Sequence, residues 1–171
     1  MPSALKEELI YHQYGNLLNK FDYFRVLNND FVWGLLKLIS KITYDKFDNI
    51  YEDDSFAQSM FLINKGYVKL YTDNDFAFAV YRFGNLFGDI EIMLNIRRNG
   101  TAKSMEFCQI YQIKKDALDE LLVDYPDTRK FLTKEAIRKN HKLTKYRKEI
   151  MLKIPFFGRK YQKEKSERRL E

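Results

Sequence analysis

Residues 87–104 read FGDIEIMLNIRRNGTAKS and combine a glycine, an acid, an apolar run, two adjacent arginines and a Gly-Thr-Ala sequence. Gly88 precedes a short apolar helical turn, where the missing Cβ lets the backbone approach a ligand closely. Free N–H groups at the start of such a turn attract negative charge. Asp89 would repel a phosphate unless its carboxylate turns away to accept a hydroxyl. The stretch therefore predicts either a site for a sugar phosphate or a plain tight turn between strands.

The flanking sequence has the texture of short strands. Aromatic and β-branched runs alternate with turn residues from residue 43 to residue 113. Within YVKLYT (67–72), Val68, Leu70 and Thr72 share one face of the expected strand. The sequences NKG (64–66) and TDND (72–75) are turn signals. Several short strands at this spacing indicate an antiparallel roll or barrel.

Helical patterns lie on both sides of these strands. Residues 3–42 read as helical, with Asn29 and Asp30 as capping residues of the second part. A short helix is expected from residue 114 to Pro126, followed by a long helix to residue 153. A narrow stripe interrupted by a lysine runs along the long helix at 4-3-4-3-4 spacing, through Leu132, Ala136, Lys139, Leu143, Tyr146 and Ile150. The predicted fold class is α+β, a jelly-roll-like antiparallel β-roll flanked by N-terminal helices and a long C-terminal helix.

The positive charge of the chain is concentrated at its C-terminal end. The formal net charge is +6, and residues 134–171 hold 14 basic and 5 acidic side chains. Three interpretations stay open for this region: a solvated face, contact with an anionic membrane surface, or nucleic-acid binding. The last requires a helix-turn-helix after the long helix, for which the tail is too short, so no nucleic acid is expected.

Few residues offer catalytic or metal-binding chemistry. His12 and His141 lack partners at ligand spacing, and no Ser-His-Asp, Cys-His or P-loop arrangement occurs, so we expect no metal and no enzyme. Cys108 is the single cysteine and reads as a buried thiol, which excludes an internal disulfide and fits a cytosolic compartment. The longest apolar run, at 31–39, is too short to span a bilayer and contains Lys37.

In order and spacing these features resemble a cyclic nucleotide-binding domain, the β-roll of the bacterial catabolite activator protein, kinase A regulatory subunits and several cation channels. Gly66 matches the family's turn before the second strand pair. The family's G-x-x-F-G-E-[IL] cassette is matched by Gly84, Phe87, Gly88, Asp89 and Ile90. An R-[ST]-A signature follows in the family, and the resemblance covers about residues 28–140.

The N-terminal sequence resembles the end of the helical linker that joins a channel pore to this domain, as in divergent, ciliate-like voltage-gated potassium or hyperpolarisation-activated channels. The resemblance implies distal linker helices at 1–27, the β-roll domain at 28–140, and the end of the C-terminal helix with a basic tail at 141–171. It also implies a cytoplasmic module at the cytosolic face of a membrane. Its partners would be the rest of a channel or a larger assembly, with an anionic membrane surface as a further partner of the tail.

The resemblance further implies a site for cyclic AMP or cyclic GMP at Phe87, Gly88, Asp89, Ile90, Glu91, Arg98, Gly100, Thr101 and Ala102. Gly100, however, stands where the family's arginine pairs with the cyclic phosphate. Losing that contact, worth about 1.5–3 kcal/mol, lowers affinity roughly ten- to a hundredfold. Arg98 compensates only if its loop places it inward, and surface exposure is the alternative. On this basis Gly100→Arg is expected to raise affinity if the pocket is otherwise intact.

Other departures point the same way. Asp89 is one methylene shorter than the family's glutamate, and Phe47 and Asp53 stand where the family usually has turn glycines. Channels of the ether-à-go-go type keep this fold without cyclic nucleotide regulation, and several fill the pocket with their own chain. The expected function is therefore a non-enzymatic regulatory or structural module with weak or lost nucleotide binding. The alternatives are a functional cyclic AMP or cyclic GMP sensor that gates a channel and, lower, a kinase-type regulatory subunit.

Overall fold

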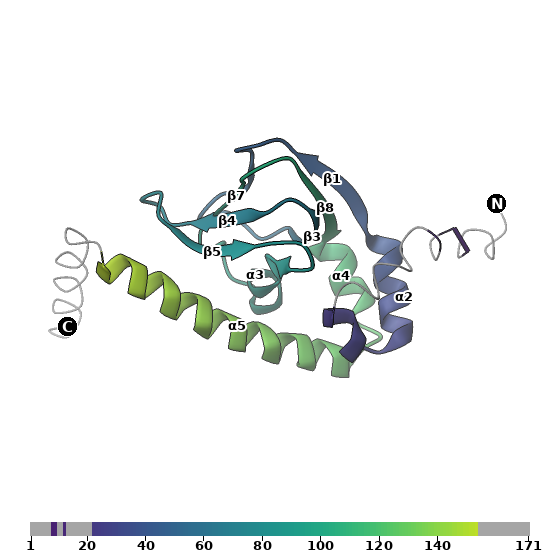
Figure 1. Ribbon diagram of the computed structural model, residues 1–171. Coiled ribbons are helices and arrows are strands. Elements are labelled where there is room, and N and C mark those ends of the chain that lie inside the picture. Colours follow the sequence, from purple (N-terminus) through teal and green to yellow (C-terminus); the bar gives the residue numbers. More distant parts are fainter. Residues whose placement is uncertain (1–7, 10–11, 13–21, 154–171) are drawn as a thin grey trace, which may run out of the picture.

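The computed structural model describes residues 8, 9, 12 and 22–153, which form a β-roll with helices at one end and a long helix across one side (Figure 1). Two four-stranded antiparallel sheets build the roll, in the orders β1-β8-β3-β6 and β2-β7-β4-β5. The elements are η1 (Asp22–Val26), α2 (Asn29–Leu38), β1 (Ser40–Tyr44), β2 (Asn49–Tyr51), β3 (Ser59–Lys65), β4 (Val68–Tyr71), β5 (Ala77–Tyr81), β6 (Leu86–Phe87), α3 (Asp89–Leu94), β7 (Thr101–Ser104), β8 (Cys108–Lys114), α4 (Lys115–Leu121) and α5 (Pro126–Lys153). The α+β prediction is confirmed.

The strand pattern in the sequence matches the burial in the roll. Val68, Leu70 and Thr72 are at most 3% exposed, whereas Tyr67, Lys69 and Tyr71 are only partly buried, so the predicted alternation is confirmed. One apolar cluster fills the inside of the roll, and a second lies between the roll, α2 and α4. Burial of alternating side chains in two facing sheets is what holds such a roll closed.

Helix boundaries differ from the prediction at both ends. The helical interpretation of residues 40–42 is wrong, because Ile42 pairs with Ile110 in the β1–β8 ladder. Asn28, one residue earlier than expected, caps α2, and its side-chain oxygen accepts from the N–H groups of Asp30 (2.8 Å) and Phe31 (3.3 Å). The β-branched residues Ile42 and Thr43 favour a strand, and pairing with β8 stabilises this conformation over a continued helix.

The second predicted boundary also moves. α4 ends at Leu121, and Pro126 begins α5 instead of ending α4. Proline suits the first turn of a helix because its missing N–H would have no partner there. The predicted helix over residues 3–21, apart from positions 8, 9 and 12, and the tail beyond Gly158 lie outside the described residues.

Two turns that lack the family's glycine still adopt the left-handed backbone. Phe47 has φ 73°, as its position in the resemblance requires. In the second turn the left-handed residue is Asp54 (φ 58°), one residue after Asp53, the position that the resemblance assigns to the missing glycine. Gly66 (φ 86°) has a steric reason to be glycine, because a Cβ there would lie 2.6 Å from the Cys108 sulfur.

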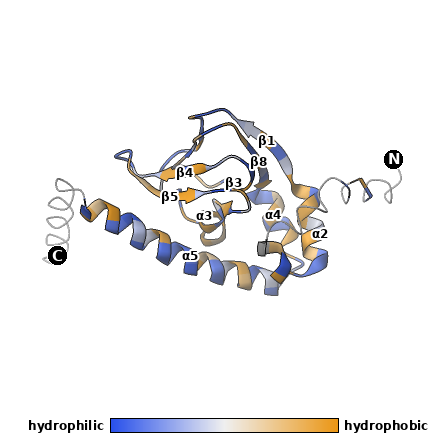
Figure 2. Ribbon diagram, viewed as in Figure 1, coloured by the Kyte–Doolittle hydropathy of each residue, from blue (hydrophilic) through white to orange (hydrophobic). Residues whose placement is uncertain are grey.

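The long helix α5 runs beside the roll and packs against α3 and β5 (Figure 1). Coloured by hydropathy, it is largely hydrophilic with isolated apolar residues (Figure 2). Leu132, Ala136 and Leu143 of the predicted stripe are buried, whereas Tyr146 is 54% exposed. The predicted domain division at residue 140 falls within α5. Among the described helices none is long and apolar enough to cross a membrane.

Candidate functional site

The predicted cassette forms a tight link from β6 into α3. Gly88 precedes α3 with φ 73°, and a Cβ there would lie 2.8 Å from an Arg98 nitrogen. Asn95 ends α3 with φ 52°, and its N–H donates to the carbonyl of Ile92 (3.3 Å). The chain then turns back toward β7, which places Arg98 against the start of α3.

Arg98 points inward, so the surface interpretation of this residue is wrong. Its side chain is 2% exposed, and Nη1 donates to the Gly88 carbonyl (2.9 Å) and to Glu91 Oε2 (3.2 Å). Nη2 donates to the Ser59 carbonyl. The guanidinium also lies 4.1 Å from the ring centroid of Tyr51. Arg98 therefore fastens α3 to β2 and β3 instead of facing a ligand.

Glu91 completes this buried ion pair. Its side chain is also 2% exposed, and burial raises the pKa of its carboxyl, an effect that the Arg98 guanidinium opposes. A phosphate would have to displace Glu91 to reach Arg98. Because both partners lie out of water, separating them leaves an uncompensated buried charge.

Asp89, the acid expected to accept a ligand hydroxyl, is held by α5. Its carboxylate lies 2.7 Å from Lys139 Nζ, and the two side chains are 5% and 27% exposed. This ion pair explains the lysine that interrupts the apolar stripe of α5. The pair ties the cassette directly to the long helix.

Gly100 lies where the resemblance expects an arginine, and the structure gives a side chain no room there. With φ 151°, a Cβ at this position would lie 2.8 Å from the Tyr71 carbonyl oxygen and 2.9 Å from the Phe78 ring. Gly100→Arg therefore requires the Tyr71 backbone or the Phe78 ring to shift, and its effect on affinity stays a prediction. Thr101 Oγ1 accepts from the Asp53 N–H (3.1 Å), and Ala102 is fully buried in the roll.

A second contact from α5, which sequence reasoning missed, lies beside Gly100. Arg147 donates to the Asn99 carbonyl (3.3 Å) and lies 3.6 Å from Asp53 and 3.9 Å from Asp73. Its guanidinium also lies 5.7 Å from the ring centroid of Phe78. The spacing of Lys139 and Arg147, eight residues apart on one helix face, is the signal that could have indicated both contacts.

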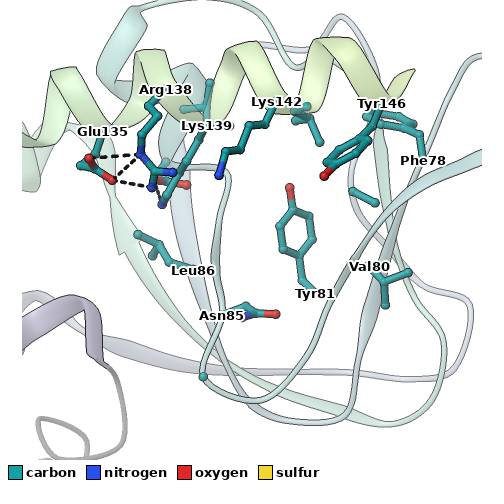
Figure 3. A pocket seen from close by; sticks show the side chains of 15 residues that line it. Phe78, Val80, Tyr81, Asn85, Leu86, Glu135, Arg138, Lys139, Lys142 and Tyr146 are labelled. Carbon is teal, nitrogen blue, oxygen red and sulfur yellow. Dashed lines mark hydrogen bonds and ion pairs between the residues drawn. The ribbon is translucent and has the colours of Figure 1, made fainter. Parts of the chain in front are cut away.

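A cavity of about 710 Å³ separates α5 from β5 and β6 (Figure 3). Fifteen residues line it: Phe78, Ala79, Val80, Tyr81, Gly84, Asn85, Leu86, Asp89, Ile90, Glu135, Arg138, Lys139, Lys142, Leu143 and Tyr146. Of the nine predicted site residues, Asp89 and Ile90 line this cavity. The other seven lie outside its lining, in the cassette, in α3, in the loop between α3 and β7, or in β7 itself.

Comparisons with known proteins agree with the fold described above. The family model of the cyclic nucleotide-binding domain matches residues 41–125. The chain is 24% identical over 166 residues to human cyclic nucleotide-gated channel beta-1, covering 92% of this chain and 13% of that protein. It is 22% identical over 150 residues to mouse potassium/sodium hyperpolarization-activated cyclic nucleotide-gated channel 2, covering 88% of this chain and 17% of that protein.

A solved structure supports the fold alone. The cAMP-bound PfPKA-R chain superposes with a TM-score of 0.72 at 17% identity, covering 85% of this chain and 49% of that chain. The curated relatives are much longer proteins, and this chain spans 13% of the human beta-1 channel.

Proposed function

Because residues 41–125 belong to the cyclic nucleotide-binding domain family and are homologous to that region of cation channels, we propose a non-enzymatic regulatory or structural module with weak or lost cyclic nucleotide binding. The observation that carries the proposal is that the charged groups of the cassette already bind one another or α5. Asp89 is paired with Lys139, and Arg98 is paired with Glu91. A ligand must replace these contacts before it gains any of its own.

The energetic consequence can be estimated for each group. A hydrogen bond to a charged partner is worth about 1.5–3 kcal/mol, and each 1.4 kcal/mol is tenfold in affinity. Gly100 supplies no guanidinium, and Asp89 accepts a ligand hydroxyl only after Lys139 moves. Together these changes predict a loss of at least about a hundredfold relative to a domain with both contacts free.

Calorimetric titration of the full chain with cyclic AMP and cyclic GMP tests the proposal. We expect dissociation constants above about 50 μM, or no heat at millimolar nucleotide, equivalent to binding weaker than about −6 kcal/mol. A dissociation constant below that limit for either nucleotide would contradict the proposal. The Lys148→Met variant, which changes an exposed lysine of α5 outside the cavity lining, is titrated in the same way as a control and is expected to give the same result as the native chain.

A functional nucleotide sensor is the second candidate, and the cavity is the observation that favours it. Its volume of about 710 Å³ lies within the usual range of ligand sites, and Asp89 lies on its wall. In this alternative, the nucleotide binds beneath α5 and shifts the helix through its different affinity for two helix positions. The same titration separates the two functions. No observation favours the kinase-type regulatory subunit in the same way.

The relatives support a proposal about the partner and the location. We infer that the chain works with the rest of a channel-like protein or a larger assembly, in the cytoplasm at the face of a membrane. The excess of 14 basic over 5 acidic side chains in residues 134–171 supports contact with anionic lipid. Co-sedimentation with phosphatidylserine vesicles, but not with phosphatidylcholine vesicles, is the expected result. Equal sedimentation with both would contradict the membrane contact.

A further inference from the structure

The cavity between β5 and α5 has aromatic walls. Phe78 and Tyr81 line it from β5, and Tyr146 lines it from α5 (Figure 3). The Tyr81 ring also stacks on Phe87, with centroids 5.3 Å apart and planes 19° apart, which fixes its orientation. Leu86 and Leu143 add aliphatic surface. Walls of this kind suit a flat, apolar ring.

The charges around the cavity leave one cation without an acid. Arg138 binds Glu135 through contacts of 2.7 and 3.1 Å, and Lys139 binds Asp89 at 2.7 Å. Lys142 also lines the cavity, and no described residue forms an ion pair with it. The cavity lining thus contains two acidic and three basic side chains, which gives it a formal net charge of +1. That charge suits a ligand with a single negative charge.

A neutral hydroxyl lies close to this lysine. In Figure 3, Tyr81 extends its hydroxyl toward α5, and Lys142 and Tyr146 extend toward it from the helix. Burial, together with Asp89 and Glu91, raises the pKa of Tyr81, so its hydroxyl remains a hydrogen-bond donor at neutral pH. No described residue pairs with that hydroxyl. Two donors from opposite walls therefore converge where an anionic group would sit.

We propose that this cavity binds a planar aromatic monoanion, of the aromatic carboxylate class. The ring packs between Phe78, Tyr81 and Tyr146, and the carboxylate accepts from Lys142 Nζ and the Tyr81 hydroxyl. Such a ligand uses neither Arg98 nor the position of Gly100, and it leaves the Lys139–Asp89 pair in place. A nucleotide bound beneath α5 would occupy the same cavity, so an aromatic carboxylate and a nucleotide are expected to compete wherever both bind.

The probe is 2-naphthoate, with neutral 2-naphthamide of the same shape as the matched ligand. Both are titrated into the full chain by calorimetry, and amide resonances are followed by NMR. Naphthoate is expected to bind saturably at least about fivefold more tightly than the amide, because the charge-assisted contact is lost in the amide. The shifted resonances are expected in β5 and in α5 around residue 142. Absence of binding, or equal affinity for the two ligands, would overturn the proposal.

Three variants locate the ligand. Lys142→Met keeps the aliphatic stem and is expected to weaken naphthoate binding at least about fivefold, while Tyr81→Phe keeps the ring and weakens it severalfold. Lys148→Met, the control on the outer part of α5, is expected to bind as the native chain does. If Lys142→Met and Lys148→Met bind naphthoate equally, the ligand lies elsewhere and the assignment is wrong. Cyclic AMP is titrated into the native chain in a separate experiment. Tight binding of cyclic AMP would refute the proposed function, whereas the naphthoate titrations alone decide whether the cavity binds an aromatic carboxylate.

Discussion

Replacing Arg98 by methionine tests the role assigned to the buried ion pair. In the native chain the guanidinium binds Glu91 Oε2 at 3.2 Å and the Gly88 carbonyl at 2.9 Å, and it donates to the Ser59 carbonyl. Methionine fills much of the same volume without any donor. The variant therefore leaves one buried carboxylate and two buried carbonyl groups without their partner.

The magnitude follows from the burial of the pair. Both side chains are 2% exposed, so solvent offers no screening, and removing one partner of such a pair lowers the free energy of unfolding by about 3–5 kcal/mol. A domain of this size is usually stable by about 5–15 kcal/mol, so the loss is a large fraction of the total. The double variant Arg98→Met, Glu91→Leu removes both charges and is expected to lose less than Arg98→Met alone.

Urea unfolding followed by far-ultraviolet circular dichroism measures these differences. Arg97→Met is the matched control: this neighbour pairs with Asp54 at 3.7 Å, and the two side chains are 51% and 82% exposed. An exposed pair of this kind contributes below about 1 kcal/mol. If Arg98→Met loses no more stability than Arg97→Met, or if the double variant is less stable than Arg98→Met alone, the reasoning about the buried pair is refuted.

Three further predictions concern the same region. Lys139→Met leaves the Asp89 carboxylate, 5% exposed, without its 2.7 Å partner, so we expect a loss of about 1–3 kcal/mol and faster amide exchange in the second half of α5; unchanged exchange would contradict the contact. Gly100→Ala places a Cβ 2.8 Å from the Tyr71 carbonyl oxygen and is expected to lower stability by about 1–3 kcal/mol, whereas an unchanged melting temperature would show that the loop adapts. Burial raises the pKa of Glu91 in the folded state above the ordinary value of 4.5. The stability of the native chain relative to Glu91→Gln should therefore be highest at or below pH 4.5 and should fall as the pH rises through the folded-state pKa. An increase in this stability difference over the same pH range, measured by paired urea titrations, would contradict the prediction.

Local pattern was enough to predict the roll and the cassette turn. Val68, Leu70 and Thr72 alternate because a strand in a closed roll has one buried face, and that alternation is visible without knowing the partner strand. Gly66 and Gly88 were identifiable for a similar reason, since each adopts a positive φ at a point of close approach. Properties set by a residue and its immediate neighbours could be predicted from the sequence.

Properties set by distant partners could not be predicted. Arg97 and Arg98 are adjacent and identical in type, yet one side chain is 51% exposed and the other 2%. The exposure of each side chain depends on how the loop after α3 turns back toward β7. Lys139 and Asp89 are fifty residues apart, and only the docking of α5 on α3 brings their charges to 2.7 Å. The apolar stripe of α5 indicated that Lys139 faces the roll, but it did not indicate that Asp89 is its partner.

The contacts of α5 also define it as a mechanical arm. Leu132 and Ala136 are packed at one end, and Lys139 and Arg147 make polar contacts with the roll about 12 Å apart along the helix axis. Leu143 is buried against the roll between these two contacts. If both polar contacts and the packing of Leu143 opened while the packed end stayed in place, a tilt of about 10° near residue 136 would displace residue 153 by about 4 Å over a span of about 25 Å. A small chemical event at Asp89 or Asn99 would thus become a larger displacement at the far end of the helix, where the chain continues.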